Sequence, residues 1–203
     1  MDLLKHIYIP VIFFVLTQNI YGQNSVIDCY QQSYKLENEG KYMAAIGMLK
    51  RIKADTYAQN LRLGWLYYLA GQYRQGLNYY AKAIHIRPNS IEAKLGYVLP
   101  AAKLKMWKQV GDQYDAILQI DPNNYKANYY RGLIYYNTGN YKKAAQYINR
   151  LVNLYPFDYD AVILAGWNTY YMKNINQAKA LFYEAKLIRP SSESATQGLK
   201  ICK

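Results

Sequence analysis

Histidine and cysteine are almost absent from this sequence, which contains two residues of each. His6 lies in an apolar N-terminal segment, and His85 has no cysteine, aspartate or glutamate at the spacing of a metal site. The sequence also lacks a glycine-rich phosphate loop and a nucleophile motif. We therefore expect no catalytic residue, no cofactor and no metal, and we predict that the protein is not an enzyme.

Acidic residues are also scarce, with 13 aspartates and glutamates against 25 lysines and arginines. Asp112 and Asp115 are three residues apart, and paired carboxylates can perform acid–base catalysis. Nothing in the sequence supplies a partner group for such catalysis. We expect the two to keep a helix surface soluble.

The apolar run at the N-terminus is too short to span a membrane, which takes about 20 apolar residues. It covers residues 7–16, follows Lys5 and His6, and is followed by polar residues and Gly22. This layout predicts a signal peptide over residues 1–22, with an uncleaved anchor as the alternative. We expect an exported protein, periplasmic or secreted, with no membrane span in the mature chain.

The two cysteines stand near opposite ends of the mature chain. Cys29 follows Asp28 and lies well past the apolar run, so it does not fit a lipid anchor. Because many helices separate Cys29 from Cys202, and a disulfide needs Cα atoms within about 7 Å, we expect no internal bridge. Cys202 could pair between chains.

Proline is rare but regularly placed. Pro88, Pro122, Pro156 and Pro190 follow one another at intervals of 34 residues. Each can end a helix, because proline lacks the N–H and clashes with the preceding turn. A fixed period of this length indicates a stack of helix–turn–helix units.

Small and aromatic residues recur with the same period. The unit 57–90 has Leu63-Gly64, Tyr67, Gly71, Tyr80 and Ala83, and related residues recur in 125–158 and 159–192. This pattern resembles the tetratricopeptide repeat family. The resemblance implies an all-α fold, a right-handed superhelical solenoid of antiparallel helix pairs. The expected segments are 23–56 (a degenerate first unit), 57–90, 91–124 (a divergent unit), 125–158, 159–192 and a capping helix over 193–203.

The recurring residues have packing roles. Gly64, Gly132 and Gly166 allow the two helices of a unit to approach closely, while Tyr80 and Phe182 fill the gap to the next unit. Gly71 and Gly139 stand where the chain needs a left-handed turn. The second helix of the last unit carries the corresponding residues Ile175, Ala178, Phe182 and Ala185.

The unit 91–124 departs from the pattern. Val98 replaces the close-approach glycine, and Lys105 replaces the turn glycine. Pro100 falls inside the first helix and predicts a kink, since its ring clashes with the carbonyl four residues earlier. The kink is either a tolerated distortion or a widening of the binding surface.

The resemblance implies that fixed positions of each first helix line a concave partner-binding groove. These positions are rich in apolar and aromatic residues, which is typical of an interaction site. We expect Trp65, Tyr68, Tyr136, Trp167 and Tyr170 to act as anchors. The full set is Leu61, Trp65, Tyr68, Leu95, Leu99, Tyr129, Leu133, Tyr136, Ile163, Trp167 and Tyr170.

The sequence thus predicts a non-catalytic scaffold that binds a protein or peptide in an aromatic groove. The chain carries a net charge of +12, much of it on the second helices. That charge indicates either a solvated face or peripheral contact with an anionic envelope surface. Nucleic acid is not an expected partner of an exported protein. Two alternatives stay open: a module that binds envelope glycan or anionic polymer, and a self-assembling structural subunit.

Overall fold

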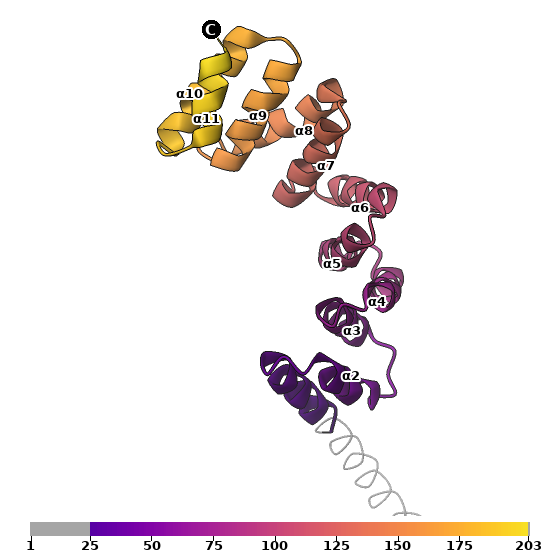
Figure 1. Ribbon diagram of the computed structural model, residues 1–203. Coiled ribbons are helices and arrows are strands. Elements are labelled where there is room, and N and C mark those ends of the chain that lie inside the picture. The colour runs from indigo at the N-terminus through magenta and orange to yellow at the C-terminus, as the bar shows by residue number, and fades with distance from the viewer. Residues whose placement is uncertain (1–24, 203) are drawn as a thin grey trace, which may run out of the picture. The chain divides into compact units, whose positions relative to one another are not determined.

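The computed structural model describes residues 25–202, and the predicted signal peptide lies outside them. The described chain is helical and contains no strand, which confirms the all-α prediction (Figure 1). A first helix covers residues 25–38. It is followed by α2 (Tyr42–Lys50), α3 (Tyr57–Leu69), α4 (Tyr73–Ile86), α5 (Ile91–Lys103), α6 (Trp107–Ile120), α7 (Tyr125–Asn137), α8 (Tyr141–Leu154), α9 (Tyr159–Tyr171), α10 (Ile175–Ile188) and α11 (Glu193–Ile201).

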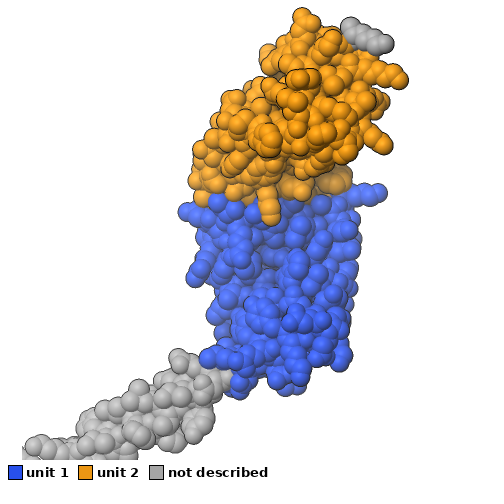
Figure 2. All heavy atoms as spheres, turned by 90° about the vertical axis from the view of Figure 1, so that its left-hand side faces the viewer, with its two compact units in different colours: residues 1–105 blue, residues 106–203 orange. Residues whose placement is uncertain are grey.

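The helices gather into two compact units, Met1–Lys105 (unit 1) and Met106–Lys203 (unit 2) (Figure 2). The most extensive contacts join the two helices of one repeat, as in α3 with α4, α7 with α8 and α9 with α10. Each second helix also packs on the next first helix within its unit. The unit boundary falls in the turn between α5 and α6, so the two helices of the divergent segment 91–124 belong to different units.

Every first helix from α3 onward begins at a polar N-cap. The cap side chain accepts a hydrogen bond from the backbone N–H three residues later, at 2.8–3.3 Å. Such a cap satisfies a backbone donor that the helix itself leaves unpaired. The caps repeat at the same interval as the prolines: Thr56, Ser90, Asn124, Asp158 and Ser192.

A second set of contacts, which we did not predict, ties successive first helices together. In each case the hydroxyl of the tyrosine that begins a first helix lies within 2.6–2.8 Å of the N-cap side chain of the next first helix. These contacts fix the spacing between repeats by side-chain hydrogen bonds as well as by apolar packing. The pairs are Tyr57 with Ser90, Tyr125 with Asp158, and Tyr159 with Ser192.

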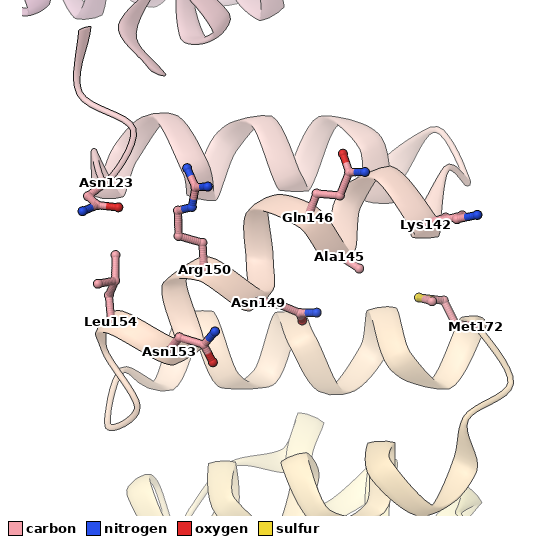
Figure 3. A pocket seen from close by; sticks show the side chains of 9 residues that line it. All are labelled: Asn123, Lys142, Ala145, Gln146, Asn149, Arg150, Asn153, Leu154 and Met172. Atoms are coloured by element: carbon pink, nitrogen blue, oxygen red, sulfur yellow. The ribbon is translucent and has the colours of Figure 1, made fainter. Parts of the chain in front are cut away.

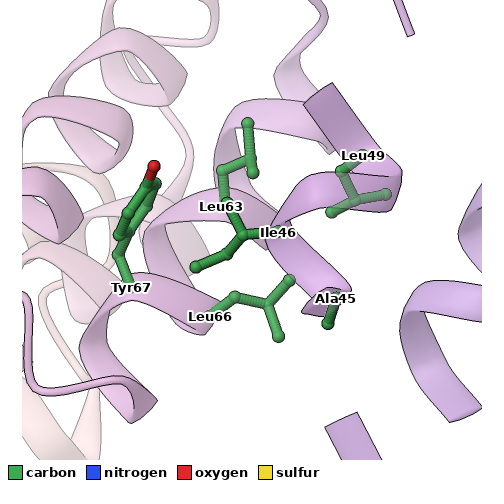
Figure 4. Packing of buried hydrophobic residues seen from close by; sticks show 6 residues of the cluster. All are labelled: Ala45, Ile46, Leu49, Leu63, Leu66 and Tyr67. Carbon is green, nitrogen blue, oxygen red and sulfur yellow. The ribbon is translucent and has the colours of Figure 1, made fainter. Parts of the chain in front are cut away.

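Unit 1 has an apolar core between α2 and α3. Ala45, Ile46 and Leu49 of α2 pack against α3 (Figure 4). On α3, Leu63, Leu66 and Tyr67 are at most 4% exposed. Tyr67 also stacks on Tyr79 of α4, with ring centroids 5.2 Å apart. This packing positions α3, the helix that carries the first group of predicted binding residues.

Close approach at the predicted glycines is confirmed. A Cβ added at Gly64 or Gly166 would lie 2.8 Å from the ring of Tyr80 or Phe182, respectively. The same rings reach the next first helix, where a Cβ at Gly96 or Gly198 would meet them at 2.1 or 2.4 Å. Each ring is therefore held between two glycines, one on either side, as a plug between repeats.

The divergent residues do not interrupt α5. Pro100 is buried, and α5 runs from Ile91 to Lys103 without interruption. The carbonyl of Pro100 still accepts a hydrogen bond from the Leu104 N–H. A kink at Pro100 remains a prediction.

The left-handed turn between paired helices is kept even where glycine is missing. Gly71 and Gly139 have φ of 73° and 74°, as predicted, and Gly40 has 71°. Lys105 and Lys173 occupy the same turn position with φ of 58° and 67°. A Cβ in this region costs about 1–2 kcal/mol, so both lysines hold the turn at the expense of stability.

We expect Lys173→Gly to raise the free energy of unfolding by about 0.5–1 kcal/mol, because glycine removes the strain but adds freedom to the unfolded chain. Urea unfolding followed by circular dichroism measures the change. Lys179→Gly is the matched control: it removes the same side chain from the exposed interior of α10 and should destabilise by about 1 kcal/mol. Equal effects of the two substitutions would contradict the strain at Lys173.

Candidate functional site

The predicted binding residues of unit 1 lie on two neighbouring first helices. Leu61, Trp65 and Tyr68 come from α3, and Leu95 and Leu99 from α5, which contacts α3 directly. Leu99 is exposed at 37%, and the other four are half-buried. The rings of Trp65 and Tyr68 lie 5.7 Å apart and tilted. We call these five residues the unit 1 face.

The helix over residues 25–38 supplies a polar partner to this face. The Trp65 indole N–H donates to Glu37 Oε1 at 2.6 Å, and Glu37 is also ion-paired with Arg62. The Arg62 guanidinium lies over the Tyr34 ring, 3.9 Å from its centroid. Sequence reasoning missed Glu37, because no other repeat has an acid at that place. The polar edge of Trp65 is thus used inside the chain, and its partly exposed ring is what the face offers to a partner.

The predicted residues of unit 2 form a second set on α7 and α9. Tyr129, Leu133 and Tyr136 pack on a cluster that includes Ala144 and Ile148. Ile163, Trp167 and Tyr170 pack on a cluster that includes Phe182 and Cys202. All six are half-buried, so each has one side in the core and another side open to solvent. We call these six residues the unit 2 face.

Two further tyrosines join this face at the turn end of its helices. Tyr141 and Tyr171 stack with centroids 5.0 Å apart, and Tyr136 lies edge-on to both at 5.8 Å. Burial and the neighbouring Tyr171 and Tyr141 hydroxyls raise the pKa of Tyr136 to about 12. Tyr171 also contacts Tyr170 and Trp167, which makes the rings one continuous cluster. Sequence reasoning missed Tyr141 and Tyr171, since they stand at the start of α8 and the end of α9, outside the first-helix positions that the resemblance assigns to the groove.

The last helix covers one edge of the unit 2 face. The Trp167 indole N–H donates to Ser194 Oγ of α11 at 2.8 Å, and the Trp167 ring lies edge-on to Phe182 at 4.9 Å. As in unit 1, the tryptophan therefore has its polar edge satisfied. The open part of the face consists of tyrosine rings, aliphatic side chains and the partly exposed ring of Trp167.

The charged groups singled out in the sequence take part in ion pairs. Arg131 donates to both carboxylate oxygens of Asp115, at 2.7 and 2.8 Å, and also to the Tyr135 hydroxyl. Asp112 pairs with Lys108 one turn earlier, in an exposed geometry. His85 is exposed on α4. Within residues 25–202, no group of three histidine, cysteine or acidic residues could hold a metal ion.

The two cysteines are unpaired in the described chain. Cys29 is half-buried, whereas Cys202 is 1% exposed and packs with Ala178 and Phe182. Burial raises the pKa of the Cys202 thiol, so it reacts less readily than a free cysteine. This burial argues against the pairing between chains that the sequence left open.

No described helix has both the length and the apolar character to cross a membrane.

Two family models for the tetratricopeptide repeat match the chain, one over residues 57–90 and the other over residues 125–158. No curated protein matches it.

Several solved structures share the fold. A tetratricopeptide repeat protein from Parabacteroides merdae superposes with a TM-score of 0.76 and 19% identity, over 88% of this chain and 72% of that one. YrrB, described as a TPR protein with an unusual peptide-binding site, gives 0.72 and 17%, over 91% of this chain and 97% of its own. MamA from Desulfovibrio magneticus gives 0.71 and 19%, over 83% and 97%. At these identities the likeness establishes the fold.

Proposed function

Because this chain belongs to the tetratricopeptide repeat family, we propose that it is an exported scaffold that binds segments of a partner protein on its first helices. Stacked helix pairs provide a surface and no chemistry of their own. The signal layout of residues 1–22 supports export. The partner segment is an apolar helix or an extended strand, the two forms that such surfaces accept.

The observation that carries this proposal is the half-burial of the two faces. Each of the eleven residues keeps some surface open to solvent, although all are apolar or aromatic. Contiguous exposed apolar surface is uncommon on a protein that has no partner. Tyrosine and tryptophan provide large contact area at a low cost in side-chain entropy, and they are enriched among residues that dominate binding energy. The peptide-binding site named for YrrB, a protein of the same fold, is a further support.

The tyrosine hydroxyls add orientation to this apolar contact. Burial raises the pKa of Tyr129 and Tyr136, so both hydroxyls stay protonated and can donate hydrogen bonds to a partner's carbonyl groups. Lys126 and Asp160 are exposed at the start of the same two helices, α7 and α9. The unit 2 face can therefore bind an apolar stretch and a polar backbone together.

We expect Trp65→Ala and Trp167→Ala each to weaken partner binding by about 2 kcal/mol, or about 30-fold in Kd. The partner is first captured from the native envelope fraction by wild type and lost by the double variant, and is then titrated by calorimetry. Trp107→Ala is the matched control, since Trp107 is 56% exposed on a second helix and belongs to neither set of predicted binding residues. If both face variants bind as wild type does, while the partner itself is confirmed, the proposal is wrong.

A further inference from the structure

The second helix α8 carries an open trough that is lined mainly by polar side chains. The trough has a volume of about 540 Å³ and lies within unit 2 (Figure 3). It follows α8 along its length, from Asn123 and Leu154 at one end to Lys142 and Met172 at the other. A second hollow around Tyr141 adjoins it and shares Lys142 and Met172. We call the hollow along α8 the α8 trough.

The lining of the α8 trough is cationic and rich in amides. Its polar residues from α8 are Lys142, Gln146, Asn149, Arg150 and Asn153, all exposed, and no carboxylate lines it. Within the described chain, none of the three amide side chains makes a hydrogen bond. Arg150 donates to the Pro122 carbonyl at 2.9 Å, which fixes its guanidinium over the trough while leaving other N–H groups free.

Helix stability alone does not explain this choice of residues. Asparagine is one of the weaker helix formers, at about 0.6 kcal/mol less favourable than alanine in a helix interior, and α8 carries the exposed Asn149 at such a position and the exposed Asn153 in its last turn. Lysine and glutamate keep an exposed helix face soluble, and both form helices better than asparagine does. The α8 trough has no glutamate at all. Its residues are those that hydrogen-bond a ligand backbone and attract negative charge.

We propose that the α8 trough binds an extended, acidic peptide segment, separately from the segment bound by the first helices. Lys142 and Arg150 are eight residues apart, or about 12 Å along the helix axis. In an extended peptide, residues i and i+4 point to the same side and lie about 13 Å apart. Two acidic side chains at that spacing therefore match the two cations, and the amides between them match backbone N–H and C=O groups.

Two observations favour a peptide from another protein over the other occupants. None of the nine residues that line the α8 trough is aromatic, so the trough itself lacks the flat platform on which a sugar ring would stack, and the only ring in the adjoining hollow is Tyr141. A second copy of this chain is disfavoured because each copy carries a net charge of +12. The lining offers two cations and unpaired amide groups, which suit a peptide whose acidic side chains have the same spacing as the two cations.

The register makes the proposal testable with two labelled peptides of equal composition. One is Gly-Glu-Ser-Ser-Ser-Glu-Gly, with acids at i and i+4, and the other is Gly-Ser-Glu-Glu-Ser-Ser-Gly, with adjacent acids. Fluorescence anisotropy at low salt measures the binding of each to the full chain. We expect the spaced peptide to bind about tenfold more tightly, because only it engages both cations through charge-assisted hydrogen bonds.

Paired variants distinguish peptide binding in the α8 trough from attraction to the net positive charge of the chain. Lys142→Gln with Arg150→Gln should weaken binding of the spaced peptide about tenfold, and Asn149→Ala with Asn153→Ala about threefold. Lys179→Gln with Lys200→Gln makes the same charge change at exposed sites on α10 and α11 and should leave Kd within about twofold. Trp65→Ala and Trp167→Ala should not change it, which distinguishes this site from the first-helix faces.

Four results would overturn the proposal. Equal binding of the two peptides, or an equal loss in the control pair, would mean that only net charge attracts them. Absence of binding by either peptide would remove the acidic segment as the occupant. If polygalacturonate binds in a way that depends on Lys142 and Arg150 while the spaced peptide does not, the trough is a site for an acidic polysaccharide.

Discussion

Replacing Phe182 with alanine is expected to lower the free energy of unfolding of unit 2 by about 4 kcal/mol. The Phe182 side chain is fully buried, with 0% exposure, and fills the space between Gly166 and Gly198. Neither glycine has a side chain that could move into the vacated volume, so the cavity stays open. Trp167, edge-on to the Phe182 ring at 4.9 Å, loses its main core contact at the same time.

The loss should be greatest at the C-terminal end, where Phe182 is the largest side chain beneath α11. Urea unfolding gives the global change, and the rate at which a thiol reagent modifies Cys202 reports local opening, since Cys202 packs against Phe182. We expect the free energy of unfolding to fall and the rate of Cys202 modification to rise in the same variant. Tyr183→Ala is the matched control, because Tyr183 is the next residue on α10 and is 58% exposed. It should change the free energy of unfolding by less than about 0.5 kcal/mol. A Phe182 variant that unfolds as wild type does would refute the plug between glycines.

The repeat period was enough to predict most of the fold. Prolines at equal intervals indicated where second helices end, and Gly64, Gly132 and Gly166 indicated where helices approach within a pair. These features recur because every helix pair faces the same packing problem. Sequence reasoning therefore worked best for contacts that all repeats share.

Contacts that only one or two repeats make were missed. Gly96 and Gly198 accommodate Tyr80 and Phe182 from the preceding repeat, but at this position the other first helices carry larger residues such as Tyr130 and Leu164. The 34-residue period of the sequence predicts only those contacts that every repeat makes. The pairing of Glu37 with Trp65 has the same explanation.

The eleven predicted binding residues lie on first helices, but their hydrogen-bond partners and their exposure needed coordinates. Sequence could not say that the indole N–H groups of Trp65 and Trp167 have partners inside the chain. The α8 trough was also beyond reach, because Asn123 and Met172 approach α8 only through the turns that flank it. Surfaces built from residues of several helices depend on the stacking geometry, which no linear pattern contains.

We expect Gly96→Ala to destabilise unit 1 by about 3 kcal/mol, although alanine is normally the better helix former by about 1 kcal/mol. The added methyl carbon would lie 2.1 Å from Cε1 of Tyr80 and 2.6 Å from its Cζ. The Tyr80 ring cannot retreat, since Gly64 closes its other side at a distance that would put a Cβ only 2.8 Å away. Either α4 and α5 must separate or the ring must leave its rotamer, and both lose buried contacts.

A control and a second variant make the origin of this cost measurable by urea unfolding. Gly47→Ala adds the same methyl in the middle of α2, where nothing lies within 4 Å, and should stabilise by about 1 kcal/mol. In a Tyr80→Ala background the ring is gone, so Gly96→Ala should change sign and stabilise as it does at Gly47. This reversal is a coupling between two residues in contact, which a double-mutant cycle isolates. If Gly96→Ala costs the same with and without the Tyr80 ring, then the ring does not set the spacing of α4 and α5, and the packing of unit 1 must be explained by other contacts.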